Sequence, residues 1–349
     1  MVEWKKLGEV CEVLDSQRKP VSKGKRSQGE YPYYGANGIQ DYVDGYIFDG
    51  TYLLLGEDGS VINNDNSPVL HWATGKIWVN NHAHILQENN KALLRYLYYT
   101  LQCTDVSDIV RGMPPKINQA NLRNILIPIP SLSEQTRIVG ILDTFTSAID
   151  NLKEQIAQRR KQYEYYRDQL LDLEGKPGVE MKTLGEMTKV LRGKRLTKNM
   201  LDEEAPYPVF HGGIEPLGFY SQYNREANTV MIINVGASAG TVGYCDRKFW
   251  SSDGCFCISQ SDSINNKFLY YYLETKTHYL QSQVRHAGIP TLDNPVVEKI
   301  YVPLLTLSEQ KRIVSILDTF EASIQNLEAQ LKEREKQYEY YRNKLLTFE

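Results

Sequence analysis

The sequence has few of the features that mark exported, membrane-spanning or nucleic-acid-coating proteins. Only five of its 349 residues are cysteines, and no two of them form a C-x-x-C motif, which is typical of reduced thiols in a cytosolic protein. No apolar run approaches the roughly 18 residues that a membrane helix requires, and the N-terminal residues lack the apolar core of a secretion signal. We therefore expect a cytoplasmic location and no membrane partner. The formal net charge of −3 excludes a simple polycation, but it allows a local basic surface.

An internal repeat is the most informative feature that is present. Residues 127–174 and 302–349 align without a gap at an offset of 175, and 28 of these 48 positions are identical. The segments before each copy match only at scattered anchors, such as Leu7-Gly8-Glu9 with Leu184-Gly185-Glu186. The chain is therefore predicted to contain two copies of one plan, a variable head followed by a constant segment.

Each constant segment is predicted to be one long helix. Ser131-x-x-Glu134 and Thr306-x-x-Glu309 are capping-box patterns, and apolar residues then recur in alternating steps of four and three, as in a heptad seam. We predict spacer helices over residues 131–174 and 306–349, each about 60 Å long. The predicted helix-helix seam consists of Ile138, Leu142, Phe145, Ile149, Leu152, Ile156 and Tyr163 in the first copy, and Ile313, Leu317, Phe320, Ile324, Leu327, Leu331 and Tyr338 in the second.

The connection between the first helix and the second head predicts how the helices pair. Roughly nine extended residues reach about 30 Å, which is too short to return along a rod of about 60 Å, whereas antiparallel helices need no return. We therefore expect an α+β fold with a pseudo-two-fold internal repeat, in which an antiparallel coiled coil of two long helices separates two globular heads, residues 1–130 and 175–305. The outer polar side chains of the helices are candidates for a protein-docking surface or for a merely solvated face; they include Gln135, Arg137, Arg160, Lys161, Glu164 and Arg167.

Both heads mix short β-type runs and turns with a helix, predicted at Leu93–Gln102 and Lys267–Glu274. In each head a basic loop follows the L-G-E anchor, and aromatic, amide or imidazole side chains come after it. Lys and Arg contact phosphates, and Arg, Asn, Gln and Lys read base edges. One such loop alone is typical of a solvated surface, but its recurrence in two divergent heads favours DNA binding. The predicted contacts are Arg18, Lys19, Lys23, Lys25, Arg26, Tyr33, Tyr34 and Asn37 in the first head, and Arg192, Lys194, Arg195, Lys198 and His211 in the second.

Motifs that suggest chemistry are weak. Gly236-Ala-Ser238-Ala-Gly240 matches G-x-S-x-G, but a strand-like run follows it instead of the helix that a nucleophile elbow needs, so a hairpin turn is expected. His82-x-His84 places two imidazoles on one strand face, yet no cysteine or carboxylate spacing completes a metal site. Cys255-x-Cys257 is predicted to point both thiols into the core. We predict no catalytic residue, no metal and no cofactor.

The repeat plan and several motifs resemble the specificity subunits of type I restriction-modification systems. The resemblance covers essentially the whole chain, and the motifs that carry it are the L-S-E-Q-x-R-I-V-x-I-L-D helix start, Tyr31-Pro-Tyr-Tyr-Gly-Ala-Asn-Gly38, Gly56-Glu-Asp-Gly-Ser60 and Asn81-His82-Ala83-His84. It implies that each head is a target recognition domain for one half of a split double-stranded DNA site. It also implies that the helices set the spacing and dock two methyltransferase subunits, that restriction/translocase subunits join the complex, and that this subunit has no catalytic centre.

The same resemblance adds a closing loop before each helix to the predicted DNA contacts. In the first head this loop is Arg111-Gly-Met-Pro-Pro-Lys-Ile-Asn118; in the second, Thr291 and Asp293 replace Lys116 and Asn118. The added contacts are Arg111, Lys116, Arg285 and His286; His82, in the Asn81-His82-Ala83-His84 motif, is predicted to be either structural or a DNA contact. The leading hypothesis is thus a non-catalytic DNA-recognition subunit. The alternatives are a coiled-coil scaffold whose heads bind proteins, and a hydrolase centred on Ser238.

Overall fold

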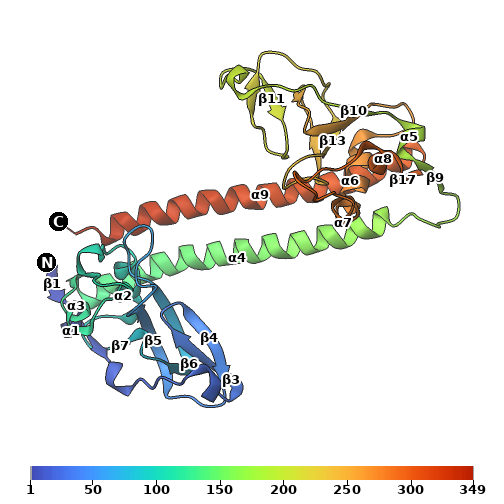
Figure 1. Cartoon of the computed structure of the whole chain (residues 1–349). Coiled ribbons are helices and arrows are strands. Elements are labelled where there is room, and N and C mark those ends of the chain that lie inside the picture. The colour runs from blue at the N-terminus through green and yellow to red at the C-terminus, as the bar shows by residue number, and fades with distance from the viewer. Residues whose placement is uncertain (1, 349) are drawn as a thin grey trace. The chain divides into compact units, whose positions relative to one another are not determined.

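The structure, a computed structural model, describes residues 2–348. The chain divides into two compact units: unit 1 contains Met1–Lys153 and Ala329–Glu349, and unit 2 contains Glu154–Glu328. Each unit joins one head to part of both long helices (Figure 1). The compact units therefore do not follow the linear order of the repeat.

Head 1 is built on a six-stranded sheet of order β2-β7-β5-β6-β3-β4, in which only the β3–β6 pair is parallel. A second pair joins β1 antiparallel to β8. The strands are β1 (Glu3–Lys6), β2 (Cys11–Val13), β3 (Gln28–Gly35), β4 (Gly38–Val43), β5 (Phe48–Gly56), β6 (Leu70–Val79), β7 (Ala83–Glu88) and β8 (Leu126–Ile129). The helices are α1 (Leu7–Val10), α2 (Leu94–Leu101) and α3 (Gln119–Arg123).

The central strand of head 1 separates two apolar cores, because successive side chains of a strand point to opposite faces. Leu53 and Leu55 pack with α1, α2 and the start of the first long helix, whereas Leu54 packs with Ile77 and Ile85 on the other face. The first core thus ties the sheet to the long helices, and the second supports the distal half of the head.

Head 2 distributes its strands over smaller sheets, of order β10-β16-β13-β14 and β12-β11-β15, with β17 paired to β9. Its strands are β9 (Glu180–Thr183), β10 (Val190–Arg192), β11 (Tyr207–Phe210), β12 (Gly218–Tyr220), β13 (Thr229–Ile233), β14 (Val242–Cys245), β15 (Trp250–Ser251), β16 (Cys255–Ile258) and β17 (Tyr301–Leu304). Its helices are α5 (Leu184–Met187), α6 (Asn266–Thr275), α7 (Thr277–Ser282) and α8 (Asn294–Glu298). Alternate residues of β13 again face two cores.

The two constant segments form the long helices α4 (Leu132–Leu171) and α9 (Leu307–Leu346). Each starts at a hydroxyl cap: the hydroxyls of Ser131 and Thr306 accept from the N–H groups of Glu134 and Glu309, both at 3.3 Å. No helix among residues 2–348 combines the length and the apolar character needed to cross a bilayer.

The parts of α4 and α9 within each unit run antiparallel. In unit 1, Leu142 packs in one core with Leu346, Phe145 stacks on Tyr341 at 5.3 Å, and Lys153 pairs with Glu335 at 3.6 Å. Residues later in α4 contact residues earlier in α9, as antiparallel pairing requires.

Unit 2 repeats this arrangement with the roles of the helices exchanged. Tyr166 stacks on Phe320 at 5.4 Å, and Leu171 packs with Ile313 and Leu317. Arg160 of α4 also pairs with Glu328 of α9. The antiparallel prediction is therefore confirmed within each unit.

The seam differs from a simple coiled coil at the start of each helix. Ile138 and Leu142 belong to the core of head 1, and Ile313 and Leu317 to that of head 2. Tyr163 and Tyr338 also pack against these cores. The helices are therefore continuous with the hydrophobic interiors of the heads as well as packed on each other.

One residue of the predicted outer helix face is in fact buried. Gln135 is 0% exposed; its side-chain oxygen accepts from the Leu93 N–H at 2.9 Å, and its nitrogen donates to the Pro130 carbonyl at 3.0 Å. Gln310 makes equivalent bonds to Asn265 and Leu305. The prediction that Gln135 lies on an outer face, whether for docking or merely solvated, was wrong, because this amide joins the helix start to the helix of the head.

Candidate nucleic-acid interface

The basic loop of head 1 connects β2 to β3 and rests on aromatic side chains. The Trp78 indole N–H donates to the Lys19 carbonyl at 2.6 Å, and the Tyr33 hydroxyl accepts from the Val21 N–H at 2.9 Å. Arg26 lies over the Tyr33 ring at 4.1 Å. Three cations of the loop are exposed on this support, namely Lys19, Lys23 and Lys25.

Not every predicted contact in this loop is accessible. Tyr33 is 1% exposed and Tyr34 is 9% exposed. Arg26 also pairs with Asp41 at 3.2 Å, and Arg18 is held among buried carboxylates. We therefore assign Arg18, Arg26, Tyr33 and Tyr34 to the support of the loop, and we keep exposed Lys19, Lys23, Lys25 and Asn37 as proposed DNA contacts.

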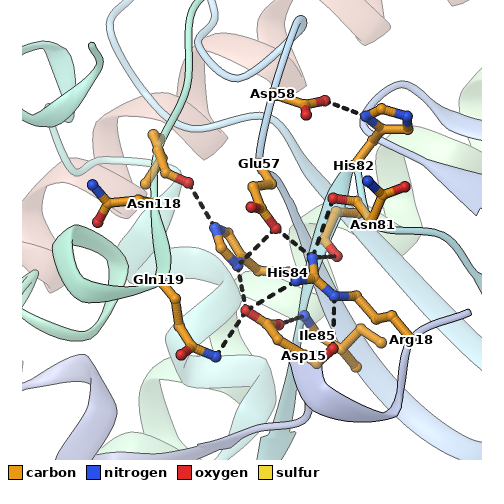
Figure 2. A network of polar contacts seen from close by, with 12 residues as sticks. Asp15, Arg18, Glu57, Asp58, Asn81, His82, His84, Ile85, Asn118 and Gln119 are labelled. Carbon is orange, nitrogen blue, oxygen red and sulfur yellow. Dashed lines mark hydrogen bonds and ion pairs between the residues drawn. The ribbon is translucent and has the colours of Figure 1, made fainter. Parts of the chain in front are cut away.

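A largely buried charge network includes Arg18 of this loop (Figure 2). The ring of His84 faces two acceptors: Asp15 Oδ2 lies 2.6 Å from Nδ1, and the Ile117 carbonyl lies 2.8 Å from Nε2. These two contacts join His84 to the loop between β2 and β3, which contains Asp15, and to the closing loop, which contains Ile117. The Arg18 guanidinium contacts the Glu57 carboxylate, and Lys116 Nζ lies 3.0 Å from Glu57 Oε1.

The network keeps its carboxyl groups ionised. Burial opposes ionisation of Glu57, but hydrogen bonds from Arg18 and Lys116 outweigh it and hold the Glu57 pKa below its usual value. Burial likewise opposes ionisation of Asp15, but the hydrogen bond and charge of His84, with Arg18, leave the Asp15 pKa lowered. Both acids are therefore ion-pair partners at neutral pH.

The spacing of residues in the sequence did not predict that carboxylates lie next to His82 and His84. Asp58 contacts the His82 ring, and Asp15 contacts His84 (Figure 2). Asp15, Glu57 and His84 present ligand atoms within 4.8 Å of one another, close enough to share a metal ion. Arg18 reaches both carboxylates, however, so the residues present form a satisfied ion-pair cluster and offer a metal no free donor set. His82 stays a proposed DNA contact, since 48% of its side chain is exposed.

The closing loop of head 1 sits beside this network. Backbone bonds between Arg111 and Lys116, at 2.8 and 2.9 Å, close it into a narrow hairpin. Met113 at its tip is 100% exposed, and its counterpart loop in head 2 presents Ile289 at 71%. Neither apolar tip was among the residues predicted from the sequence to contact DNA. In some DNA complexes, exposed apolar side chains insert as wedges between base steps. The sequence feature that could have indicated these tips is an apolar residue in a loop that contains Gly and Pro.

Head 2 positions its basic loop in a similar way. The Trp250 indole N–H donates to the Lys194 carbonyl at 2.8 Å, which matches the contact of Trp78 with Lys19. The loop cations are exposed: Arg192, Lys194, Arg195 and Lys198. In the closing loop His286 is exposed, while Arg285 pairs with Asp293 at 2.7 Å. That ion pair weakens the case for Arg285 as a phosphate contact.

Head 2 contains the two remaining motifs of the sequence, the G-x-S-x-G pattern and the pair of cysteines. The Gly236–Gly240 motif connects β13 to β14, which pair antiparallel, so Ser238 lies in a hairpin connection as predicted. This geometry is not a nucleophile elbow, which removes the basis of the hydrolase alternative. Cys255 and Cys257 are both buried in one cluster with Met231 and Ile233, which confirms the prediction for these thiols.

A repeated α+β head with an exposed basic loop, attached each time to a long helix, defines a two-headed modular binding protein. The type I restriction modification DNA specificity domain matches the chain twice, over residues 1–159 and 177–335. The chain belongs to this family, whose members are the DNA sequence-recognition subunits of type I restriction-modification systems.

Individual proteins show the same likeness over their full lengths. A Haemophilus influenzae protein named as a type I restriction enzyme specificity subunit is 33% identical over 99% of this chain and 96% of its own. The specificity subunit of an Escherichia coli type I restriction enzyme is 27% identical over 99% and 94%. The crystal structure of the type I S subunit from M. genitalium covers 100% of this chain and 97% of its own with a TM-score of 0.77, at 19% identity.

Proposed function

We propose that each head reads one half of an asymmetric bipartite target on double-stranded DNA, and that the paired helices set the spacing between the halves. The observation that carries this proposal is the recurrence of one support in two unlike heads. In both, a tryptophan indole holds an exposed basic loop next to a narrow closing loop. Because the side chains on these loops differ, the two heads should prefer different base sequences.

We further propose that the helices dock two methyltransferase subunits, to which restriction/translocase subunits are added. A solved structure titled for complex assembly and conformational transition of the type I restriction-modification system covers 99% of this chain at a TM-score of 0.54. The helices offer exposed polar side chains such as Arg137, Lys161 and Glu164. The near-neutral charge of the subunit releases few counterions by itself, so partner subunits would supply much of the phosphate contact.

The test is methylome sequencing of cells that express the complex, before and after residues 1–130 are exchanged for a foreign head. This boundary keeps β1 with its partner β8. The expected result is a split methylated motif in which only one half changes and the spacer length is kept. A change in both halves would contradict independent reading. A complex that assembles yet shows no salt-dependent affinity for any duplex would favour the protein-binding scaffold.

A further inference from the structure

Backbone hydrogen bonds identify Glu57 of head 1 and Asn234 of head 2 as equivalent positions. The Glu57 N–H donates to the His82 carbonyl and the Glu57 carbonyl accepts from Ile117, at 2.8 and 2.9 Å. The Asn234 N–H donates to the Gly254 carbonyl and the Asn234 carbonyl accepts from Leu292, at 3.2 and 2.9 Å. Both residues follow the central strand of their sheet and face the closing loop.

The side chains at these two equivalent positions differ in charge and in whether they have a partner. The Glu57 carboxylate is paired with Arg18 and Lys116. Asn234 is 3% exposed, and its side-chain oxygen Oδ1 has no hydrogen-bond partner among residues 2–348. Thr291, which occupies the closing-loop position that corresponds to Lys116, adds no charge there. Burying an amide without a partner costs free energy, so the position favours a ligand that supplies one.

Asn234 lines a pocket of about 490 Å³ in head 2. The exposed cations Arg192, Arg195 and Lys198 also line it, as does the partly exposed Asp253. His211 is a further lining residue; its Nδ1 accepts from the Gly254 N–H at 3.2 Å and lies 3.4 Å from Asp253 Oδ1. The carboxylate and the buried neutral amide among the lining residues disfavour a phosphate beside them, whereas the exposed cations suit the phosphates on either side of a base.

We propose that this pocket is the base-reading pocket of head 2, and that Asn234 is its specificity-determining residue. The inference rests on the proposed function of the heads. The Asn234 oxygen accepts a hydrogen bond from an exocyclic amino group, and its nitrogen donates to the neighbouring ring nitrogen. Adenine offers N6 and N7 in this arrangement, while cytosine offers only the amino group. The base read here is therefore adenine.

The test uses methylome sequencing of the complete complex with three variants of this subunit. Asn234→Ala removes the amide and should relax one position of the head 2 half-site, where preference for adenine falls about 10-fold or more. Asn234→Asp has the same shape and keeps an acceptor, so it should lose adenine over cytosine discrimination at that position. Asn294→Ala is the matched control, because Asn294 in head 2 also has a buried side-chain oxygen without a partner but lies outside the pocket; its motif should stay unchanged.

The outcomes separate this proposal from the proposed function. A wild-type motif with two unlike halves supports the proposed function irrespective of Asn234. If both Asn234 variants then keep the wild-type preference at every position, the pocket does not read a base and the proposal is overturned. If Asn234→Ala yields no methylation, the isosteric Asn234→Asp decides: a change confined to one base pair supports the proposal, and an unchanged motif overturns it. A change in the half-site of head 1 also overturns it.

Discussion

The two heads share a main-chain support but differ in what they bury beneath it. In head 1 the position after the central strand is Glu57, locked between Arg18 and Lys116 and next to the Asp15–His84 pair. In head 2 the same position is Asn234, which is neutral and whose side-chain oxygen has no partner in the described part of the chain. In both heads the loops are held by backbone hydrogen bonds and a tryptophan indole. The main-chain support therefore tolerates replacement of the side chains around it, as a family of variable readers requires.

The largest expected effect is on the stability of head 1. Glu57→Ala leaves Arg18, 13% exposed at its side chain, without its main counter-charge, and removal of one partner of a buried ion pair costs about 3 kcal/mol or more. Asn234→Ala removes no hydrogen bond to the oxygen and should cost less than about 1 kcal/mol. Urea unfolding of both variants measures the contrast. Equal losses in the free energy of unfolding would show that Glu57 does not stabilise its head more than Asn234 does.

The stacked rings of the long helices allow a comparison between the units. Phe145→Ala removes the stack on Tyr341 in unit 1, and Phe320→Ala removes the stack on Tyr166 in unit 2. Because both rings are half-buried, each substitution should lower the free energy of unfolding by about 2 kcal/mol, less than the usual cost of removing a fully buried phenylalanine ring. Hydrogen exchange should show each loss in its own unit. A loss in one unit alone would contradict the equivalence of the two helix pairings.

Acid should weaken head 1 through its two buried acids. The pKa values of Asp15 and Glu57 are lowered in the folded chain, so their contribution to stability is complete above their unfolded values of about 4 and is lost as the pH falls through the folded values. Urea unfolding at pH 5 and pH 3 should reveal this loss. Glu57→Gln should flatten the dependence; an unchanged slope in that variant would exclude Glu57 as a source.

The smallest effects concern single phosphate contacts. Lys25→Ala in head 1 and Lys198→Ala in head 2 remove exposed loop cations. Each should weaken binding of the assembled complex to all sequences and reduce the salt slope of the binding constant by about one. Titrations at several salt concentrations measure this change. An altered base preference, with the same salt slope, would show that the lysine reads a base.

Sequence reasoning located the repeated elements well, because their evidence is periodic. The heptad pattern predicted helices over 131–174 and 306–349, and the structure has α4 at Leu132–Leu171 and α9 at Leu307–Leu346. The helix expected at Lys267–Glu274 is α6, Asn266–Thr275, which Asn265 caps. These signals are local, so neighbouring residues suffice to reveal them.

The contacts inside the heads could not be predicted from the sequence, because they join residues that are far apart along the chain. Asp15 meets His84 across 69 positions, and Arg18 meets Glu57 across 39. A basic loop in the sequence therefore did not reveal that Arg18 points inward while Lys19, Lys23 and Lys25 remain exposed. Gln135 was misplaced for the same reason, since its partner Leu93 lies 42 residues away.

The most direct test of two independent readers is a chain in which residues 175–305 are replaced by a second copy of residues 1–130. The long helices pair antiparallel within each unit, so the two identical heads should read the two strands in opposite senses. We expect methylome sequencing to return an inverted repeat of the head 1 half-site with a spacer between its halves. A direct repeat, or retention of the original asymmetric motif, would contradict it.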